Sequence, residues 1–510
     1  MLAAGKLNTV NGGIGDDAMV SAGKNNLLFG GLGNDIVLGA GEKNFISGDD
    51  GNDLVFAAGK KNVVLGGSGK DTIVTAGQTN VVSGGDDKDI IVGLGKANYA
   101  DGGNDDDIVV GLGKGNKLSG GAGDDLLFAA GEANTFFGGS GDDIALGLGK
   151  GNTLVDDNGD DWLLAAGKNN KFFDLLGDDV VISAGEANKV YTFWGDDIVF
   201  AGGKTNTIDT GSGDDFVLAG GQTNKISTGG GDDFVLAGGK TNKISTGGGR
   251  DYIFVGGQSN TIDAGDGSDL IIAGGQTNDI KGGKGDSIIV SFGKKNSIET
   301  GSGSDLIIAG GQSNFVEAGS GYNVVLSIGQ NNVIKGTGGD NFFLGFGGGN
   351  TMVGGNGVNI FMMGATNDFI GGAAADTFVV DDGSFGDLFG GDDTPESGRM
   401  TVNNVGNDDT TDTLLFGGDT DIQELRFQQE GNDLLINNSG DGSEVLVQHW
   451  YSSVTDRIDE FKIEGGATLV KQQVDSLVDA WNQYDAGNIS IFSLGGRVAN
   501  AWSEVSNNIG

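Results

Sequence analysis

A repeat of 18 residues dominates this sequence. The pattern Gly-x-x-Asn begins at Gly5 and Asn8 and returns at every eighteenth residue up to Asn350, twenty times without an insertion. Nine residues after each Asn stands a second marked position, which is Asp in most repeats and follows a glycine-rich stretch such as residues 12–15. Each repeat therefore consists of two unlike nonapeptides, an Asn half and an Asp half. Such a short fixed period predicts a fold in which each repeat packs on its neighbours.

The apolar residues of the repeat indicate the fold class. An apolar side chain stands two residues after both the Asp and the Asn, as in Val55 and Val64 or Ile271 and Ile280. No stretch before residue 400 keeps a helical period of 3.6. Short strands joined by glycine turns would return the chain to its start after each repeat and stack the turns about 4.8 Å apart. We therefore predict an all-β fold, a parallel β-roll (β-solenoid) of 18-residue turns, with these apolar positions in the core.

The regular repeats end before the C-terminus. Asn367 follows Asn350 by 17 residues, after which the period is lost. Strand-like runs such as Thr413–Phe416 follow, and then Val474 and Leu477 fall at helical spacing. Because the first repeat starts almost at the N-terminus, we expect the chain to be the C-terminal piece of a longer protein. The predicted segments are a β-roll (1–381), an acidic linker (382–412), a C-terminal β capping domain (413–466) and a helical tail (467–510).

The Asp half carries the chemistry. Its glycines let backbone carbonyl groups turn toward a cation, and carboxylates stacked one turn apart repel each other unless a cation lies between them. Ca²⁺ prefers six to eight such hard oxygen ligands, so we predict a row of Ca²⁺ ions between neighbouring turns. The alternative, that the Asp residues only end strands as turn residues, is weakened by their regular recurrence. The sixteen predicted ligands are Asp17, Asp35, Asp53, Asp71, Asp89, Asp107, Asp125, Asp143, Asp161, Asp179, Asp197, Asp215, Asp233, Asp251, Asp269 and Asp305.

The row has defects, and the Asn half differs from it. Ser287 replaces the Asp of one turn, and Asn323, Asn341 and Asn359 end the row, so we expect weak or empty sites there. In the Asn half, Lys or Gln usually stands two residues before the Asn, as at Lys24, and an edge without anions does not collect Ca²⁺. We expect the stacked Asn side chains to form a ladder of amide hydrogen bonds instead.

Composition argues against several classes of function. The 71 acidic and 30 basic residues give a net charge of −41, so nucleic acid is not an expected partner. The chain has no Cys, its one His is His449, and it contains no HExxH or G-x-S-x-G motif, so we expect no enzymatic activity. It has neither an apolar run long enough to span a membrane nor the pattern of a cleaved signal peptide, so a secreted form needs another route.

One outer face is predicted to be apolar. The residues on either side of the core position of the Asp strand must point outward, yet they are apolar in nearly every turn. This apolar stripe is larger than the patches that monomers ordinarily expose. Two explanations remain open: packing on another roll or on the parent chain, and contact with a membrane or a pore. The stripe includes Ile36, Leu38, Leu54, Phe56, Ile108, Val110, Phe216, Leu218, Leu270 and Ile272.

The glycine and aspartate stretches at residues 121–125 and 139–143 resemble the nonapeptide of the repeats-in-toxin (RTX) family. Their alternation with A-x-G-x-x-N resembles the C-terminal repeats of the multifunctional autoprocessing toxins of that family (MARTX). The module around Gln448-His449-Trp450-Tyr451 is similar to the family's C-terminal domain.

The resemblance implies a Ca²⁺-binding C-terminal module of a secreted RTX toxin. It implies the type I secretion machinery as a partner, with an uncleaved signal in the helical tail, and folding on extracellular calcium. For the MARTX subclass it implies repeats that assist pore formation in a host membrane and effector translocation, and thus a role in virulence. The alternatives are the calcium-stiffened stalk of a secreted RTX adhesin and the calcium-binding tail of a secreted enzyme.

Overall fold

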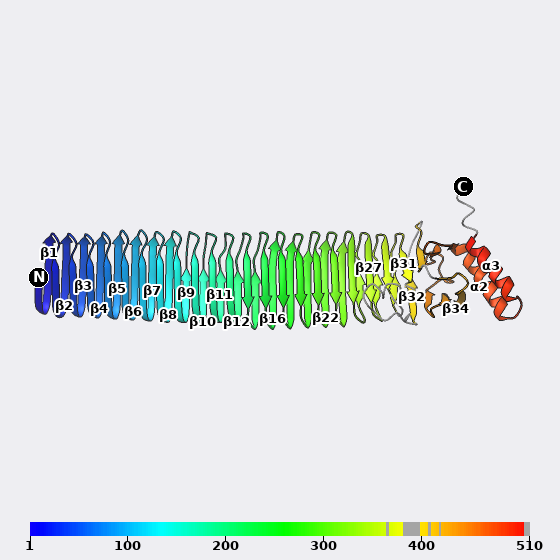
Figure 1. Ribbon diagram of the computed structural model, residues 1–510, viewed down its shortest axis with the longest axis horizontal. Helices are drawn as coiled ribbons and strands as arrows, with labels where there is room; N and C mark the ends of the chain where they lie inside the picture. The colour runs from blue at the N-terminus through cyan, green and yellow to red at the C-terminus, as the bar shows by residue number, and fades with distance from the viewer. Residues whose placement is uncertain (364–366, 381–397, 406–409, 418–419, 504–510) are drawn as a thin grey trace. The chain divides into compact units, whose positions relative to one another are not determined.

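Successive repeats form successive turns of a parallel β-solenoid, as predicted (Figure 1). The computed structural model describes residues 1–363, 367–380, 398–405, 410–417 and 420–503, and these belong to two compact units divided between Val255 and Gly256. The pairing register equals the repeat, since Val37 pairs with Val55 and Asn44 with Asn62. Every side chain therefore lies beside its own counterpart in the next turn.

In the first unit, most turns are one long strand that passes around the Asn corner. The sequence predicted two short strands for each turn. The strands are longer because backbone pairing continues through the corner, as at Gly41 and Gly59. They are β1 (Leu2–Ile14), β2 (Ala18–Leu32), β3 (Ile36–Asp50), β4 (Leu54–Ser68), β5 (Thr72–Asp86), β6 (Ile90–Asn104), β7 (Ile108–Ala122), β8 (Leu126–Ser140), β9 (Ile144–Val155), β10 (Trp162–Phe173), β11 (Val180–Tyr191), β12 (Ile198–Asp209), β13 (Phe216–Gly220), β14 (Thr223–Ser227), β15 (Phe234–Gly238), β16 (Thr241–Gly248) and β17 (Tyr252–Gly256).

In the second unit, the solenoid turns consist of two short strands, as the sequence predicted. They are β18 (Ser259–Asp266), β19 (Leu270–Gly274), β20 (Thr277–Gly283), β21 (Ile288–Phe292), β22 (Lys295–Ser302), β23 (Leu306–Gly310), β24 (Ser313–Ser320), β25 (Asn323–Ile328), β26 (Val333–Lys335), β27 (Asn341–Phe346), β28 (Thr351–Val353), β29 (Asn359–Met363), β30 (Asp368–Ile370) and β31 (Thr377–Val380). The one-residue slip near the end is present, because Thr351 pairs with Asp368.

The core is a narrow double column of the predicted apolar residues. Val55, Val64, Ile271 and Ile280 are each completely buried. Where one side chain is larger, its neighbour is smaller: a methyl group on Gly147 would lie 3.0 Å from the ring of Phe136. Each turn therefore buries only a few large side chains, and the polar groups at its corners have a large share in its stability.

The predicted amide ladder is confirmed at the Asn corner. The amide nitrogen of Asn98 donates to Oδ1 of Asn116 at 2.7 Å, and Asn116 donates in the same way to Asn134 at 2.7 Å. These amides are buried, and each nitrogen also reaches a backbone carbonyl of the next turn, as from Asn98 to Leu112 at 3.3 Å. An amide has both a donor and an acceptor, so a stack of Asn side chains satisfies itself.

The solenoid ends in a cap of mixed strand direction. The cap strands are β32 (Arg399–Asn403), β33 (Thr413–Phe416), β34 (Leu425–Glu430), β35 (Asp433–Asn438), β36 (Glu444–Val447), β37 (Glu460–Ile463) and β38 (Thr468–Val470). Strand β36 pairs parallel with β32 on one side and antiparallel with β35 on the other. The last parallel turn is therefore covered by antiparallel strands, which protects its edge.

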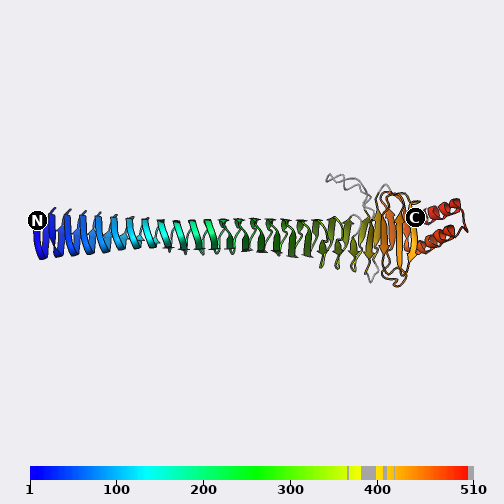
Figure 2. The ribbon, with the colours of Figure 1, turned by 90° about the horizontal axis from the view of Figure 1, so that it is seen from below.

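Two helices, α2 (Lys471–Asp485) and α3 (Ile491–Ser503), follow the last cap strand (Figure 2). Trp502 of α3 packs on Phe427 of β34, with ring centroids 6.4 Å apart. Of the segment predicted as a linker, residues 398–405 include β32, whereas 382–397 and 406–409 lie outside the described residues. Among the helices that the structure describes, none has the length and apolarity needed to cross a membrane.

The amide ladder predicts a measurable loss on truncation. Asn116→Ala removes two ladder bonds and leaves the buried amide of Asn98 without its acceptor. We expect the free energy of unfolding, measured by urea denaturation in saturating Ca²⁺, to fall by about 2–4 kcal/mol. Lys114→Ala, in the same turn but exposed, is the control and should change it by less than about 0.5 kcal/mol. Equal effects of the two substitutions would contradict the ladder's role.

Candidate metal centre

The structure stacks the predicted aspartates of the first unit as a continuous column. In the first unit the column, which we call the inner row, runs from Asp17 to Asp251, and all its members after Asp17 are buried. Asp269 and Asp305 of the second unit are also buried. The inner row lies at the glycine-rich corner, where Gly121 and Gly123 both have φ near 121° and so take a conformation that other residues rarely adopt.

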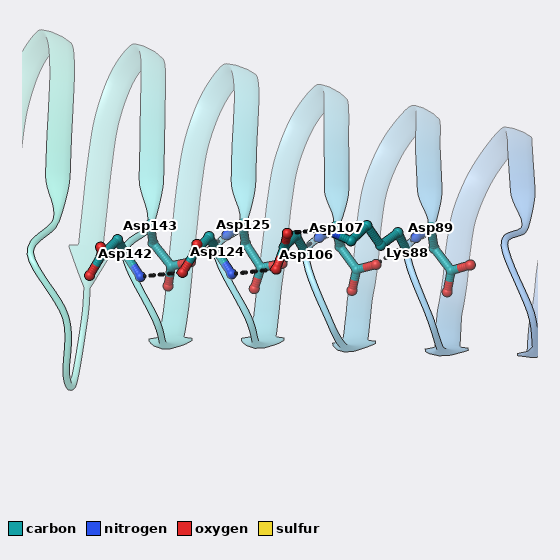
Figure 3. A network of polar contacts seen from close by, with 8 residues as sticks. All are labelled: Lys88, Asp89, Asp106, Asp107, Asp124, Asp125, Asp142 and Asp143. Carbon is teal, nitrogen blue, oxygen red and sulfur yellow. Dashed lines mark hydrogen bonds and ion pairs between the residues drawn. The ribbon is translucent and has the colours of Figure 1, made fainter.

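Each inner-row carboxylate uses one oxygen to bind the backbone. The N–H of Asp107 donates to Oδ1 of Asp125 at 2.7 Å, and the N–H of Asp125 donates to Oδ1 of Asp143 at 2.7 Å. Figure 3 shows these side chains in neighbouring turns. The bond fixes the orientation of the carboxylate and directs its second oxygen, Oδ2, into the corner.

The second oxygen has no hydrogen-bond donor in most turns of the first unit. A buried polar atom without a partner is costly, and a buried charge is more so. Such a column of acceptors calls for a cation. These turns include nine consecutive ones, those of Asp35, Asp53, Asp71, Asp89, Asp107, Asp125, Asp143, Asp161 and Asp179.

A backbone oxygen converges on the same point. A methyl group placed on Gly102 would lie 2.2 Å from Oδ2 of Asp107 and 2.6 Å from the carbonyl oxygen of Gly120 in the next turn. The missing side chain of Gly102 therefore lets a carboxylate oxygen and a carbonyl oxygen approach each other. Carboxylate and carbonyl oxygens are the ligands that Ca²⁺ takes in proteins, so the residues present fit this ion.

Burial changes the acidity of the inner row. It is the largest cause that raises the pKa of Asp53 to about 6 and the pKa of Asp71 to about 7, and the neighbouring carboxylates of the row add to it. The same causes raise the pKa of Asp107 and of Asp143 to about 7. Near neutral pH the bare row therefore resists full ionisation.

A second acidic column, the outer row, was not predicted. It holds the residue before the inner-row aspartate, which is Asp in every turn from Asp106 to Asp232; Asp106 is partly exposed and the others are exposed. The N–H of Asp142 donates to Oδ1 of Asp124 at 2.9 Å, the reverse of the direction in the inner row (Figure 3). Lys88 forms an ion pair with Asp106 in this column. The doubled Asp-Asp of the repeat was visible in the sequence and could have indicated it.

At the predicted defects of the row, the neutral side chains that replace Asp form hydrogen bonds with neighbouring turns. The N–H of Asp269 reaches Oγ of Ser287 at 3.3 Å. Further along, the amide of Asn323 donates to Oδ1 of Asn341 at 3.0 Å, and Asn341 to Asn359 at 2.8 Å, so the column becomes an amide ladder. That these turns bind Ca²⁺ weakly or not at all stays a prediction.

The column does not end at Asn359, as the sequence suggested, but continues into the cap. The N–H of Asn359 donates to Oδ1 of Asp376 at 2.9 Å, and the N–H of Asp376 to Oδ1 of Asp412 at 2.8 Å. The N–H of Asp412 then donates to Asp459 at 3.0 Å. Asp376 follows Asn367 by the usual nine residues, but Asp412 and Asp459 lie where the period is lost, so no spacing rule could have found these two.

The residue at the first glycine position of the Asp half varies between repeats, and the sequence did not predict the effect of this variation. This position, five residues before the inner-row Asp, is Gly in the early turns but Asp156 and Asp174 in two later ones. In other turns it is Thr, and the hydroxyls of Thr210 and Thr228 donate to Oδ2 of Asp215 and Asp233. In those turns a hydroxyl satisfies the oxygen that lacks a donor elsewhere.

The apolar stripe lies outward, as predicted, and its side chains are partly exposed. Ile36, Phe56 and Leu218 are 45%, 39% and 37% exposed. Aromatic rings stack along it, with those of Phe216 and Phe234 5.1 Å apart. The Asp strand therefore contributes its core residue to the interior and these rows to the surface.

This solenoid, with a buried column of carboxylates at a glycine corner, belongs to the class of cation-binding repeat folds. A model of the RTX calcium-binding nonapeptide repeat matches residues 11–46, 47–82, 83–113, 111–145, 191–226, 227–262, 255–289, 292–325 and 329–361. These matches cover more than half of the chain, which therefore belongs to the RTX repeat family. The repeats of this family bind Ca²⁺, and proteins that contain them are typically secreted. No curated protein matches the chain.

Substitutions in the two rows should separate their roles. Asp107→Asn and Asp125→Asn together keep the acceptor for the backbone N–H and remove two charges from the inner row. We expect the number of Ca²⁺ ions bound per chain, measured by equilibrium dialysis, to fall by about three, because the two residues border three intervals between turns. The matched control is Asp106→Asn with Asp124→Asn in the exposed outer row, which should leave that number unchanged. Equal losses in both variants would refute the assignment.

The raised pKa values predict opposite effects of acid with and without Ca²⁺. In the metal-free protein, folded-state pKa values of about 6 to 7 lie above the ordinary value of 3.8, so folding takes up protons. The stabilisation is complete below about pH 4 and is lost as pH rises through 6 to 7.

Acidification from pH 7.5 to 5.5 should therefore increase β-structure in metal-free buffer. In Ca²⁺ it should weaken ion binding, because protons compete for the same oxygens. Circular dichroism at both pH values measures each effect, and loss of β-structure on acidification without metal would contradict the first.

Proposed function

We propose that this chain is a module that folds when it binds Ca²⁺ outside the cell. The observation that carries the proposal is the inner row, whose buried Oδ2 atoms lack donors in nine turns of the first unit. Glycine-rich turns cost much conformational entropy to order, and repulsion between stacked carboxylates adds to that cost. At low cytosolic Ca²⁺ the chain would stay unfolded, and millimolar Ca²⁺ outside would make binding and folding one event. The predicted inner-row aspartates would supply the carboxylate ligands.

The unfolded state suits an export route through a narrow channel. We place the type I secretion signal in the helical tail, residues 467–510, behind a β-roll at 1–381, an acidic linker at 382–412 and a β capping domain at 413–466. The RTX repeats support this proposal, because proteins that contain them are typically secreted. The module would have a structural rather than a catalytic role.

The fuller form of the proposal is the C-terminal module of a MARTX-type toxin that assists pore formation and effector translocation at a host membrane. The half-exposed apolar stripe supports it, since a large apolar surface needs a partner, either lipid or another protein surface. The alternative is the calcium-stiffened stalk of a secreted adhesin. The unbroken register of the repeats suits that alternative, because stacked identical turns resist bending.

Calcium dependence is tested by circular dichroism of the full chain during a Ca²⁺ titration. We expect a disordered spectrum in excess chelator and a β spectrum with a sigmoidal transition as Ca²⁺ rises to about millimolar levels. Mg²⁺ at the same concentrations is the control and should be much less effective, because it dehydrates reluctantly and demands octahedral geometry. A β spectrum that excess chelator leaves unchanged would overturn the proposal.

Leakage of dye from liposomes distinguishes the toxin module from the stalk. The toxin form predicts Ca²⁺-dependent leakage that Leu218→Lys with Leu236→Lys abolishes, because both side chains lie in the apolar stripe. Ser227→Lys with Ser245→Lys places the same two charges on the strands of the Asn half in the same turns and should retain leakage. No leakage from the folded wild-type protein would favour the stalk.

A further inference from the structure

The turns of Asp161 and Asp179 differ in their interior from the other solenoid turns that the structure describes. Asp156 and Asp174 stand where the early turns have Gly, and both are buried, with 1% and 0% of the residue exposed. With Asp143, Asp161 and Asp179 of the inner row they bring five carboxylates together. The family model matches residues up to 145 and again from 191, so these turns depart from the common repeat.

The five carboxylates form two overlapping groups of three. One carboxylate oxygen from each of Asp143, Asp156 and Asp161 lies within 4.8 Å of the other two, and the same holds for Asp161, Asp174 and Asp179. A Ca²⁺ ion lies 2.3–2.6 Å from its ligands, so oxygens on opposite sides of it are separated by about 5 Å. Both groups therefore have the size of a Ca²⁺ coordination shell, and Asp161 belongs to both.

All five carboxylates present a free oxygen in the same way. Backbone N–H groups occupy the Oδ1 atoms, as from Gly139 to Asp156 at 3.0 Å and from Leu175 to Asp174 at 2.8 Å. For the inner-row members, the N–H of Asp143 donates to Asp161 at 2.6 Å. No donor reaches any of the five Oδ2 atoms, which are buried. The orientation is thus fixed by the backbone, while one oxygen of each residue remains for a ligand.

The two added carboxylates replace a neutral ligand of the ordinary turns. A methyl group on Gly138 would lie 2.0 Å from Oδ2 of Asp156 and 2.3 Å from Oδ2 of Asp143. At Gly102 the corresponding approach is made by a backbone carbonyl of the next turn. Asp156 therefore brings a negative charge to a position that elsewhere holds only a dipole.

Such a cluster cannot stay fully charged by itself. Burial, followed by the charges of Asp161 and Asp143, raises the pKa of Asp156 to about 8. Burial and the charges of Asp179 and Asp161 raise the pKa of Asp174 strongly as well. Two divalent cations would neutralise four of the five charges, whereas the alternative is that protons hold Asp156 and Asp174 neutral.

We propose that Asp143, Asp156, Asp161, Asp174 and Asp179 form a two-ion Ca²⁺ cluster inside the solenoid, distinct from the ordinary sites of the row. The inference rests on the proposed calcium-dependent folding and adds the location of its tightest sites. Affinity for Ca²⁺ rises with the number of charged ligands, so these two ions should bind about tenfold or more tightly than the others.

The test compares Ca²⁺ binding to full-length variants by competition with a chromophoric chelator. Asp156→Thr with Asp174→Thr installs the residue that Thr192 and Thr210 hold at this position. We expect this variant to lose the two tightest ions and retain the weaker ones. Asp157→Thr with Asp178→Thr removes two exposed carboxylates from the same turns and should retain all of them. Asp156→Gly with Asp174→Gly, which copies Gly120 and Gly138, is the second loss variant if the first does not fold.

A measurement on the wild-type cluster needs no change in its ligands. Trp162 follows Asp161 directly, so Tb³⁺ at the cluster should emit when tryptophan is excited. We expect this emission within the first two equivalents of Tb³⁺, and its loss in Trp162→Phe.

The outcomes separate this inference from the proposed function. Unchanged affinity and ion number in both loss variants, or no sensitised emission at low Tb³⁺, overturns the cluster and leaves the row intact. Such a result would assign protons to Asp156 and Asp174. A wild-type chain that binds no Ca²⁺ overturns the proposed function together with the cluster.

Discussion

The structure depends on one constraint: at the register of one repeat, every side chain stacks on its own counterpart in the next turn. For Asn this stacking is self-satisfying, because each amide donates to the next and accepts from the previous one, as Asn116 does. For Asp it is not, since a carboxylate can only accept. The backbone N–H supplies one donor per residue, and the second oxygen of Asp107 remains without any. The two corners thus have the same backbone pairing, but only the Asp corner needs a further partner for its side-chain oxygens.

The chain meets that need differently along the same column. In the early turns, glycine brings a carbonyl oxygen to the free carboxylate oxygen, an arrangement suited to a cation. At Thr210 and Thr228 a hydroxyl supplies the missing donor. At Asn323, Asn341 and Asn359 the carboxylate itself is replaced by an amide, which needs no counter-ion. The need for cations is therefore absent from the column at these three Asn turns, where side-chain amides form the hydrogen bonds between turns, and carboxylates return to the column at Asp376.

The 18-residue period predicted the features that recur in every turn and did not predict the features that occur only once or twice. The core positions such as Val55, the amide ladder and the aspartate column all follow from the spacing of 18 residues, because parallel register converts spacing into contact. Asp412 and Asp459 continue the column from segments with no common spacing, so only the fold could bring them together. The inward direction of Asp156 was hidden for another reason. A repeat pattern describes the usual residue at a position, and this position is usually glycine.

In the Asp half of each repeat, one strand supplies both the core residue and the residues of the apolar stripe. Alternate residues of one strand point to opposite faces, so the strand that follows Asp215 places Val217 in the core and Phe216 and Leu218 in the apolar stripe. The stripe exists as a continuous surface only when neighbouring turns stack, and stacking brings the carboxylates of Asp197 and Asp215 together. A cation that relieves their repulsion therefore also assembles the apolar surface. If folding depends on Ca²⁺ as proposed, the ion would also control when the chain presents this apolar face, because the apolar residues of the unfolded chain are dispersed.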